Sequence, residues 1–561
     1  GDTLVCWESL AFQPYFSATA ANVNYGWWSH DIGGHMGGVE DAELFTRCVQ
    51  FGVFRPIFRL HSSKNPYSER RPWGYNPEVE QITSWFMRLR NQFIPYLYTM
   101  AYRSHREGKP LVRPMYYEWP REELAYHCPD QYCFGSELLV APYLSPRDPD
   151  TRLSRQVVWL PEGVWFDFFT GLQFPGGSCQ ALHGDLSEIP LFARSGAIIP
   201  LAARAQDTAA NNPDSLEIQL FPLSDGKFCL VEDDGKGAVS EIPLVQTFEP
   251  EFWCLTLGPA AGETSHLPVA REIHLSFRGL EELAQVSAYL NGEVVEPEIH
   301  HIEETMTLKV SGLGVRAEDR LVVEIKPLKD SLKIGGNSRG STLEKLLHHF
   351  RLDSWVKQKI SLQLEAIGED PQKLVPYTQS LTDGQKRALL ETLTGVGGHM
   401  ICEKQGDGVQ VLIWNNHQRR DASYELSIRD CFHQPHFWSS KMPEYAIITV
   451  NKRGVSTCSP VNQWERFFSV SDWIQYLKDL PSELVKDLPG GTIRLILTDR
   501  FPKEEFTVQL GTEDPGERLE EDREVIIRIT EEEFLSIVNQ ETSMSEWRQQ
   551  GETHISGDLQ W

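Results

Sequence analysis

The chain has 561 residues, 40% of them hydrophobic, and a formal net charge of −26. This length suits about three or four domains with packed cores. The negative charge disfavours nucleic acid and anionic membranes as partners, because both would repel the chain. No run of about 18 apolar residues occurs, so no membrane-spanning segment is predicted. The ten cysteines are scattered, which favours unpaired thiols and a reducing, cytoplasmic location.

The N-terminal hundred residues alternate between strand-like and helix-like patterns. Residues 21–28 are short and aromatic, as in a strand, and lead into the polar loop S-H-D-I-G-G-H-M-G-G. A helix that stops at Gly52, a second buried strand over 53–60 and a long helix over 77–107, closed by Gly108, follow in order. This order is typical of a parallel α/β sheet or barrel. Only two such units are visible, and a closed barrel needs about eight.

From about residue 111 the pattern changes to short alternating strands separated by Gly-, Asp- and Asn-Gly turns. Such text predicts antiparallel β-sandwiches, here a proximal one over 111–208 and a distal one over 209–330. Residues 329–340 are polar and contain glycine, as in a linker.

The remainder reads as a helical segment over 341–400 and a β-rich module over 401–561. Two capping boxes predict helix starts, Ser341 with Glu344 and Thr382 with Gln385. His348 and His349 are neighbours on a predicted helix, so they are expected on different faces. The aromatic residues Trp414, Trp438 and Tyr445 either fill this module's own core or bind a neutral α-glucan by stacking on the sugar.

Polar residues gather where the first two predicted strands end. Asp31 follows two tryptophans and precedes Gly33 and Gly34, and His61 follows Arg59 at the end of the next strand. Paired glycines let the backbone approach a ligand closely, and aromatic rings beside carboxylates and imidazoles suit a sugar. Taken singly, each residue also has a structural interpretation, Asp31 as a helix cap and His61 as a core hydrogen-bonding group.

Together, these motifs resemble glycoside hydrolase family 31, which holds α-glucosidases and α-xylosidases. The resemblance rests on G-D at the start, W-W-S-H-D-I-G-G-H (27–35), Q-F-G-V-F-R-P-I-F-R-L-H (50–61) and R-R-P-W (70–73). It continues through V-W-L-P-E-G-V-W-F-D-F-F-T-G (158–171), P-L-F-A-R-S-G-A-I-I-P (190–200) and V-E-D-D-G (231–235), and so covers residues 1–330. The implied fold is multidomain, α/β plus all-β. Residues 1–110 would form the C-terminal part of a (β/α)8 barrel, followed by the two β-sandwich domains and the helical and β-rich module.

The resemblance implies a catalytic role for Asp2, as the general acid/base that follows the sixth barrel strand. A retaining glycosidase also needs a carboxylate nucleophile, which this family places in a W-x-D-M-x-E-like motif. The nearest match is Trp165-Phe166-Asp167, which lies in sandwich-like sequence and lacks the following Glu. The nucleophile is therefore expected upstream of Gly1, and this chain alone is expected to be inactive.

The resemblance also implies sugar-binding residues. Asp31 and His61 are expected to bind sugar hydroxyls, Arg59 to form an ion pair beside them, and Trp28 or Trp27 to wall the pocket or pack in the core. The family's usual form is D-I-G-G-F, whereas this chain has His35 in the aromatic position, which bears on substrate preference.

No metal and no cofactor are expected, because two carboxylates suffice for hydrolysis and His30 and His35 are poorly spaced to share an ion. The sequence therefore predicts the C-terminal part of a retaining, exo-acting α-glucosidase whose partner is an oligosaccharide or small α-glucoside. The alternatives are an α-xylosidase of the same family and a non-catalytic carbohydrate-binding relative. Glycosidic linkage and oligomeric state are not specified by the sequence.

Overall fold

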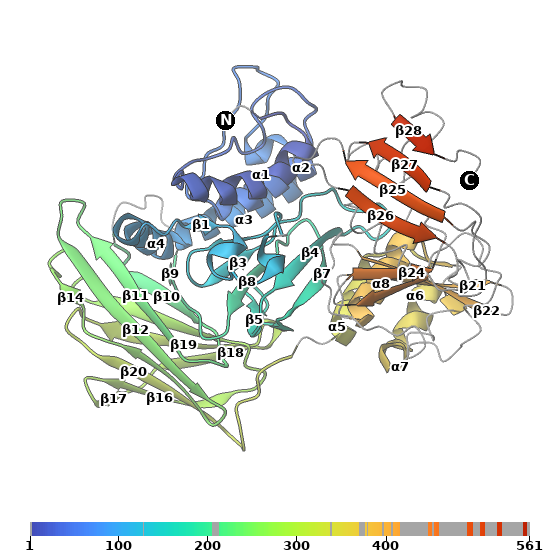
Figure 1. Ribbon diagram of the computed structural model, residues 1–561. Helices are drawn as coiled ribbons and strands as arrows, with labels where there is room; N and C mark the ends of the chain where they lie inside the picture. Colours follow the sequence, from blue (N-terminus) through green and yellow to red (C-terminus); the bar gives the residue numbers. More distant parts are fainter. Residues whose placement is uncertain are drawn as a thin grey trace. The chain divides into compact units, whose positions relative to one another are not determined.

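The computed structural model divides into two compact units, residues 1–338 and 339–561 (Figure 1). It describes residues 3–126, 128–204, 212–336, 339–369, 376–377 and 380–394, and the strand segments 398–405, 408–415, 447–451, 454–458, 491–497, 505–510, 524–529 and 554–557. None of the helices in these ranges is long and apolar enough to cross a membrane.

Four helices dominate the start of the first unit: α1 (Trp7–Thr19), α2 (Ala42–Val53), α3 (Pro77–Gln92) and α4 (Ile94–Glu107). Side-chain caps begin two of them, since Asp41 accepts from the Leu44 amide and Asn76 from the Val79 amide. Gly108 ends α4 in the left-handed conformation, as predicted.

Two of the predicted helix limits in this region are wrong. The long helix expected over 77–107 is broken at Phe93, because Pro95 has no amide hydrogen to continue the helical ladder. Gly52 lies inside α2 rather than after it, and a Cβ there would come within 2.5 Å of the Ile32 side chain. Glycine at this position therefore permits close packing of α2 rather than ending the helix.

The predictions of strands over 21–28 and 53–60 are also wrong. Residues 20–23 form a short 3-10 helix, η1 (Ala20–Val23), and 24–31 are irregular. What remains of strand pairing is two isolated parallel bridges, Ile32 with Leu60 and Leu4 with Met36. Parallel strands are stable when flanked on both sides in a larger sheet, and the described residues supply no such sheet here.

The strands predicted over 111–330 are present, and they pair antiparallel as expected except for one parallel pair, residues 215–220 with 272–277. One sheet has the order β1-β2-β3-β8-β5-β6, and β4 pairs with β7 beside it. Their bounds are β1 (Val112–Arg113), β2 (Tyr132–Phe134), β3 (Leu138–Val140), β4 (Ser154–Leu160), β5 (Val164–Asp167), β6 (Gln173–Pro175), β7 (Ser178–Gly184) and β8 (Leu191–Arg194). Trp159, Trp165 and Phe192 belong to their shared buried core.

Two further sheets follow, with the orders β18-β19-β15-β10-β9 and β11-β12-β13-β20-β16-β17, and β14 pairs with β12. Their bounds are β9 (Ile198–Ala202), β10 (Ser215–Leu220), β11 (Gly226–Asp233), β12 (Val239–Glu249), β13 (Phe252–Leu257), β14 (Ala261–Gly262), β15 (Arg271–Arg278), β16 (Ala284–Leu290), β17 (Glu293–Val295), β18 (Glu298–Ile302), β19 (Thr307–Val315) and β20 (Leu321–Pro327). The β16–β17 hairpin turns at Asn291-Gly292, and both residues have positive φ. β9 lies within 111–208, the range predicted for the proximal β-sandwich, but it pairs with β10 in the range predicted for the distal one.

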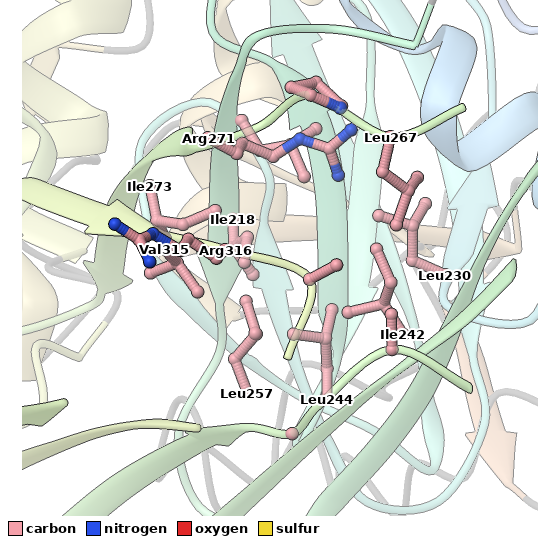
Figure 2. Close-up of a pocket in the computed structure, with 15 residues that line it drawn as sticks. Ile218, Leu230, Ile242, Leu244, Leu257, Leu267, Arg271, Ile273, Val315 and Arg316 are labelled. Atoms are coloured by element: carbon pink, nitrogen blue, oxygen red, sulfur yellow. The ribbon is translucent and has the colours of Figure 1, made fainter. Parts of the chain in front are cut away.

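A hollow lies between these two sheets, and its lining is almost wholly apolar (Figure 2). Ile218, Ile273 and Val315 come from one sheet, and Leu230 and Ile242 from the other. A sugar needs polar partners for its hydroxyls, so this hollow does not suit one. It is part of the packed interior of the sandwich.

The second unit contains helices α5 (Arg339–His349), α6 (Ser354–Ser361), α7 (Leu364–Glu369) and α8 (Asp383–Thr394). The capping box of Thr382 and Gln385 is confirmed, since each backbone amide donates to the other's side-chain oxygen. The one at Ser341 is wrong, because α5 already begins at Arg339. His348 on α5 is exposed and its neighbour His349 is half-buried.

The strands of the second unit are β21 (Gly398–Gln405), β22 (Gly408–Asn415), β23 (Ile447–Asn451), β24 (Gly454–Cys458), β25 (Gly491–Leu497), β26 (Glu505–Leu510), β27 (Glu524–Ile529) and β28 (His554–Gly557). The last four form one sheet in the order β26-β25-β27-β28. Trp414 lies in β22, whereas Trp438 and Tyr445 lie outside the described residues.

Replacing Glu232 is expected to destabilise the first unit strongly. Arg271 donates two hydrogen bonds to the Glu232 carboxylate, at 2.9 and 3.0 Å, and both side chains are buried. Glu232→Ala would leave a buried guanidinium without its counter-charge, at a cost of about 3–5 kcal/mol in the free energy of unfolding. Urea denaturation measures this change. The matched control is Glu282→Ala, which breaks an exposed ion pair with Lys333 and should leave the transition unmoved. Equal midpoints for the two variants would contradict the prediction.

Candidate functional site

Backbone pairing brings the two polar segments of the sequence together. The Ile32 amide donates to the carbonyl of Arg59 at 3.3 Å within the parallel bridge between Ile32 and Leu60. Further along, the Ser63 amide donates to the carbonyl of His35 at 2.9 Å. The segments 31–35 and 59–63 therefore run side by side, and their side chains meet at one place.

The glycine pair after Asp31 makes this turn possible. Gly33 and Gly34 have φ of 93° and 83°, a conformation that side-chain-bearing residues rarely adopt. A Cβ on Gly34 would come within 2.9 Å of the Val5 backbone. The Gly34 amide donates to the Asp31 carbonyl at 2.8 Å, and the His35 amide donates to the Thr3 carbonyl at 2.7 Å. The tight turn thus places His35 back over Asp31.

Four side chains form the resulting cluster. The Arg59 guanidinium lies 2.5 Å from Oδ1 of Asp31, and His35 Nδ1 lies 3.3 Å from Oδ2 of the same carboxylate. The ring centroids of His35 and His61 are 5.0 Å apart. The Asp31 side chain is 2% exposed, whereas those of His35 and Arg59 are 17% and 50% exposed. A buried carboxylate therefore lies at the base of a group that opens to solvent.

A buried arginine supports the turn from behind. Arg70 donates from Nε and Nη2 to the Gly34 carbonyl, at 3.0 and 2.6 Å, and from Nη1 to Glu40. Tyr75 also donates to Glu40, at 2.9 Å. The R-R-P-W motif (70–73) does not by itself indicate a role for Arg70. The run of basic residues was the available signal, but only the fold brings it to Gly34.

His30 and Trp28 lie in the interior rather than in the open part of the cluster. Trp28 is 8% exposed, and its ring packs edge-on against Phe16 and lies 4.8 Å from the Arg55 guanidinium. This geometry favours core packing for Trp28. Its neighbour Trp27 is 50% exposed and is the better placed of the two to meet a ligand.

His30 is the titratable group whose environment is most unusual here. It is 2% exposed, its ring packs on Phe51, and neither ring nitrogen has a hydrogen-bond partner. Burial, helped by the charge of Arg55, holds the pKa of His30 well below its ordinary value of 6.5. Burial likewise lowers the pKa of Arg55 to about 10. His30 is therefore a neutral core residue next in sequence to the buried carboxylate.

Of the two carboxylates considered for catalysis, Asp2 and Asp167, the structure describes only the second. Asp2 lies outside the described residues, so its role stays a prediction. Asp167 is half-buried at the end of β5, where it accepts from the Phe169 and Thr170 amides and the Thr170 hydroxyl. Burial raises the pKa of Asp167. Asp167 thus closes a turn in the sheet, in agreement with its rejection as the nucleophile.

One donor set within the described residues has the composition of a metal site. Asp31, His35 and His61 each offer a ligand atom, and these atoms all lie within 4.8 Å of one another. By sequence spacing, His30 and His35 are the histidine pair to weigh, and they are poorly placed to share an ion. The fold separates those two, burying His30 and bringing His35 to His61.

Comparison with known protein families shows which family this chain is similar to. Residues 1–100 match the profile described as "Glycosyl hydrolases family 31 TIM-barrel domain", and residues 108–199 match "Glycosyl hydrolase family 31 C-terminal domain". Over these residues, the chain is similar to glycoside hydrolase family 31. The Asp31 cluster lies within the first match. Relatives of this family that are similar to the chain include an α-xylosidase, an α-glucosidase and an isomaltosyltransferase.

Relatives named for different substrates have about the same sequence identity to this chain. An "Alpha-xylosidase" from Saccharolobus solfataricus is 30% identical over 274 residues, 47% of this chain and 36% of that protein. "Alpha-glucosidase 2" from Bacillus thermoamyloliquefaciens is 30% identical over 239 residues, 42% of this chain and 29% of that protein. The chain therefore spans about a third of the length of these relatives.

Among solved structures, a family 31 dextranase from Flavobacterium johnsoniae, crystallised with isomaltotriose, has a TM-score of 0.51 and 24% identity. The similarity covers 57% of this chain and 42% of the dextranase. At this identity the likeness establishes the fold. The matched part of the chain therefore has a barrel-type domain and a β-rich domain.

Acidification is expected to destabilise the first unit through His30. An unfolded imidazole titrates near pH 6.5, whereas folded His30 stays neutral to much lower pH. Protons therefore bind the unfolded chain first, and stability is lost as the pH falls below about 6.5. Between about pH 7.5 and 5.5 this loss is about 1.4 kcal/mol, and His30→Leu should lack it. Urea denaturation of both proteins at both pH values measures the difference. Equal pH dependence would show that His30 does not titrate in this way.

Proposed function

We propose that this chain supplies the sugar-binding residues and the acid/base of a retaining α-glycosidase acting on α-glucosides. The observation that carries the proposal is the Asp31–Arg59–His61 cluster, formed inside the segment that matches the family's barrel domain. In this proposal, Asp31 accepts hydrogen bonds from sugar hydroxyls and His61 contacts the same sugar. Arg59, paired with Oδ1, fixes the orientation of the carboxylate.

The physical support is that the cluster is preorganised. Asp31 is buried on a glycine turn that Arg70 holds from behind, so its carboxylate has little freedom to move. A site whose groups already hold their binding geometry spends less free energy on ordering when the ligand arrives. Hydrogen bonds to a carboxylate are worth about 1.5–3 kcal/mol, enough to bind and orient a hydroxyl.

The hydrolytic step needs two carboxylates, and in this proposal Asp2 is the general acid/base. It protonates the glycosidic oxygen as the bond to the sugar breaks, and later takes a proton from the attacking water. The nucleophile is a carboxylate outside residues 1–561, so the chain by itself would not hydrolyse glycosides. A longer protein that contains this chain is the one to assay.

An α-xylosidase is the second candidate, favoured by the Saccharolobus solfataricus relative at 30% identity. His35, in place of the usual aromatic residue, is the change closest to the bound sugar in this proposal. Comparing nitrophenyl α-glucoside with nitrophenyl α-xyloside, as kcat/KM on the longer protein, distinguishes the two substrates. A carbohydrate-binding relative without activity would turn over neither.

Asp31→Asn is expected to lower kcat/KM by about 10- to 100-fold, because the amide is a weaker acceptor and loses the ion pair with Arg59. The assay uses the longer protein with an aryl α-glucoside. The control is Glu282→Gln, which replaces an exposed carboxylate between β15 and β16 and should retain full activity. An unchanged kcat/KM for folded Asp31→Asn would remove Asp31 from the sugar site.

Asp2→Ala is expected to slow hydrolysis in proportion to how much the leaving group needs a proton. For a disaccharide, turnover should fall by about 10²–10⁴-fold. For a nitrophenyl glycoside, whose leaving group departs as the anion, the first step should be far less affected. Losses of the same size on both substrates would exclude the acid role.

A further inference from the structure

Asp31, His35 and His61 have a second chemical capacity besides binding hydroxyls. They bring together one carboxylate and two imidazoles, and their ligand atoms all lie within 4.8 Å. Carboxylate and imidazole are preferred ligands of Zn²⁺ and related divalent transition metals. We propose that these three residues form a binding site for a Zn²⁺-type ion, and that the bound metal blocks the sugar from the cluster.

The separation of two of the donors already fits zinc. Zn–N bonds of about 2.0–2.1 Å and Zn–O bonds of about 2.0–2.2 Å place neighbouring ligand atoms of a tetrahedron about 3.3–3.5 Å apart. His35 Nδ1 and Asp31 Oδ2 are 3.3 Å apart. The His61 donor needs to approach by at most about 1.5 Å, which a side-chain rotation provides.

The backbone holds the three donors on two paired segments. The hydrogen bonds from Ile32 to Arg59 and from Ser63 to His35 join 31–35 to 59–63 on either side of the donors. A site whose ligands are fixed before the metal arrives loses little entropy on binding. The His35 amide is also bonded to the Thr3 carbonyl, so this loop is held at a third point.

The surroundings match those of an open, three-ligand zinc site. Arg59 occupies Oδ1 of Asp31 and leaves Oδ2 for the metal, and a hydrogen-bonded ligand carboxylate of this kind is common around metals. The positive charge of Arg59 opposes the metal, but its half-exposed side chain is screened by water. His35 and His61 both retain solvent exposure, which leaves the fourth position to water.

His35 is the residue whose replacement tests the metal site. In the family's usual D-I-G-G-F form the aromatic ring has no lone pair, so only Asp31 and His61 would remain as donors. His35→Phe therefore removes one ligand and restores that form. Blocking of the sugar follows because the metal would occupy Asp31 and His61, and this consequence rests on the proposed function.

The test is zinc binding by residues 1–561, measured by competition with a fluorescent chelator, with Co²⁺ absorption as a report of coordination. The expected result is one site in the wild type whose affinity falls at least about tenfold in His35→Phe, with loss of the four-coordinate Co²⁺ spectrum. His348→Phe is the matched control, since it removes an exposed histidine on α5 and should change neither readout. Equal zinc affinity and stoichiometry in wild type and His35→Phe, with both proteins folded by circular dichroism, would overturn the site.

A second measurement separates this inference from the proposed function. Zinc should raise the apparent dissociation constant of glucose for the wild type and leave that of His35→Phe unchanged. Zinc binding that depends on His35 while glucose binding stays unaffected would support the metal site and contradict sugar binding at Asp31 and His61.

Discussion

The pairing of segment 31–35 with segment 59–63 is the constraint on which the site depends. A single parallel bridge, Ile32 with Leu60, aligns the two segments, and the ion pair of Asp31 with Arg59 joins their side chains. Because Arg59 and His61 are far from Asp31 in sequence, they would not meet it without this pairing. The glycine turn then returns the chain so that His35 faces the same carboxylate.

Buried arginines stabilise this part of the fold in two different ways. Arg47 has a partner for most of its donors, since it bonds the carbonyls of Asp185 and Glu188 and the side chains of Gln50 and Ser154. Arg55, which is fully buried, has no hydrogen-bond partner for its three nitrogens and lies instead against the rings of Trp28 and Phe51. Cation–π contacts offset part of the desolvation cost of such a group. The aromatic residues before Asp31 thus contribute to the interior under the site.

The sequence predicted most of the strands after residue 111, because alternation and Asn-Gly turns are local signals. It failed for the strands over 21–28 and 53–60. Their apolar, aromatic sequences indicate buried segments. Whether such a segment becomes a strand depends on neighbouring strands that local patterns do not specify. At the site, the motif located Asp31, Arg59 and His61. It did not locate Arg70, whose role comes from a contact across 36 residues to Gly34. Nor did it distinguish the buried Trp28 from the exposed Trp27, since neighbouring positions in an irregular loop carry no periodicity.

The central claim is that Asp31 and His61 act together on one sugar. A double-mutant cycle on glucose affinity tests it most directly, using Asp31→Asn, His61→Ala and the double variant in a longer protein that contains this chain. If both residues hold the same sugar, the two changes should not add, and the coupling free energy should be about 1 kcal/mol or more. Additive effects within about 0.3 kcal/mol, or no effect of either change on affinity, would contradict the account.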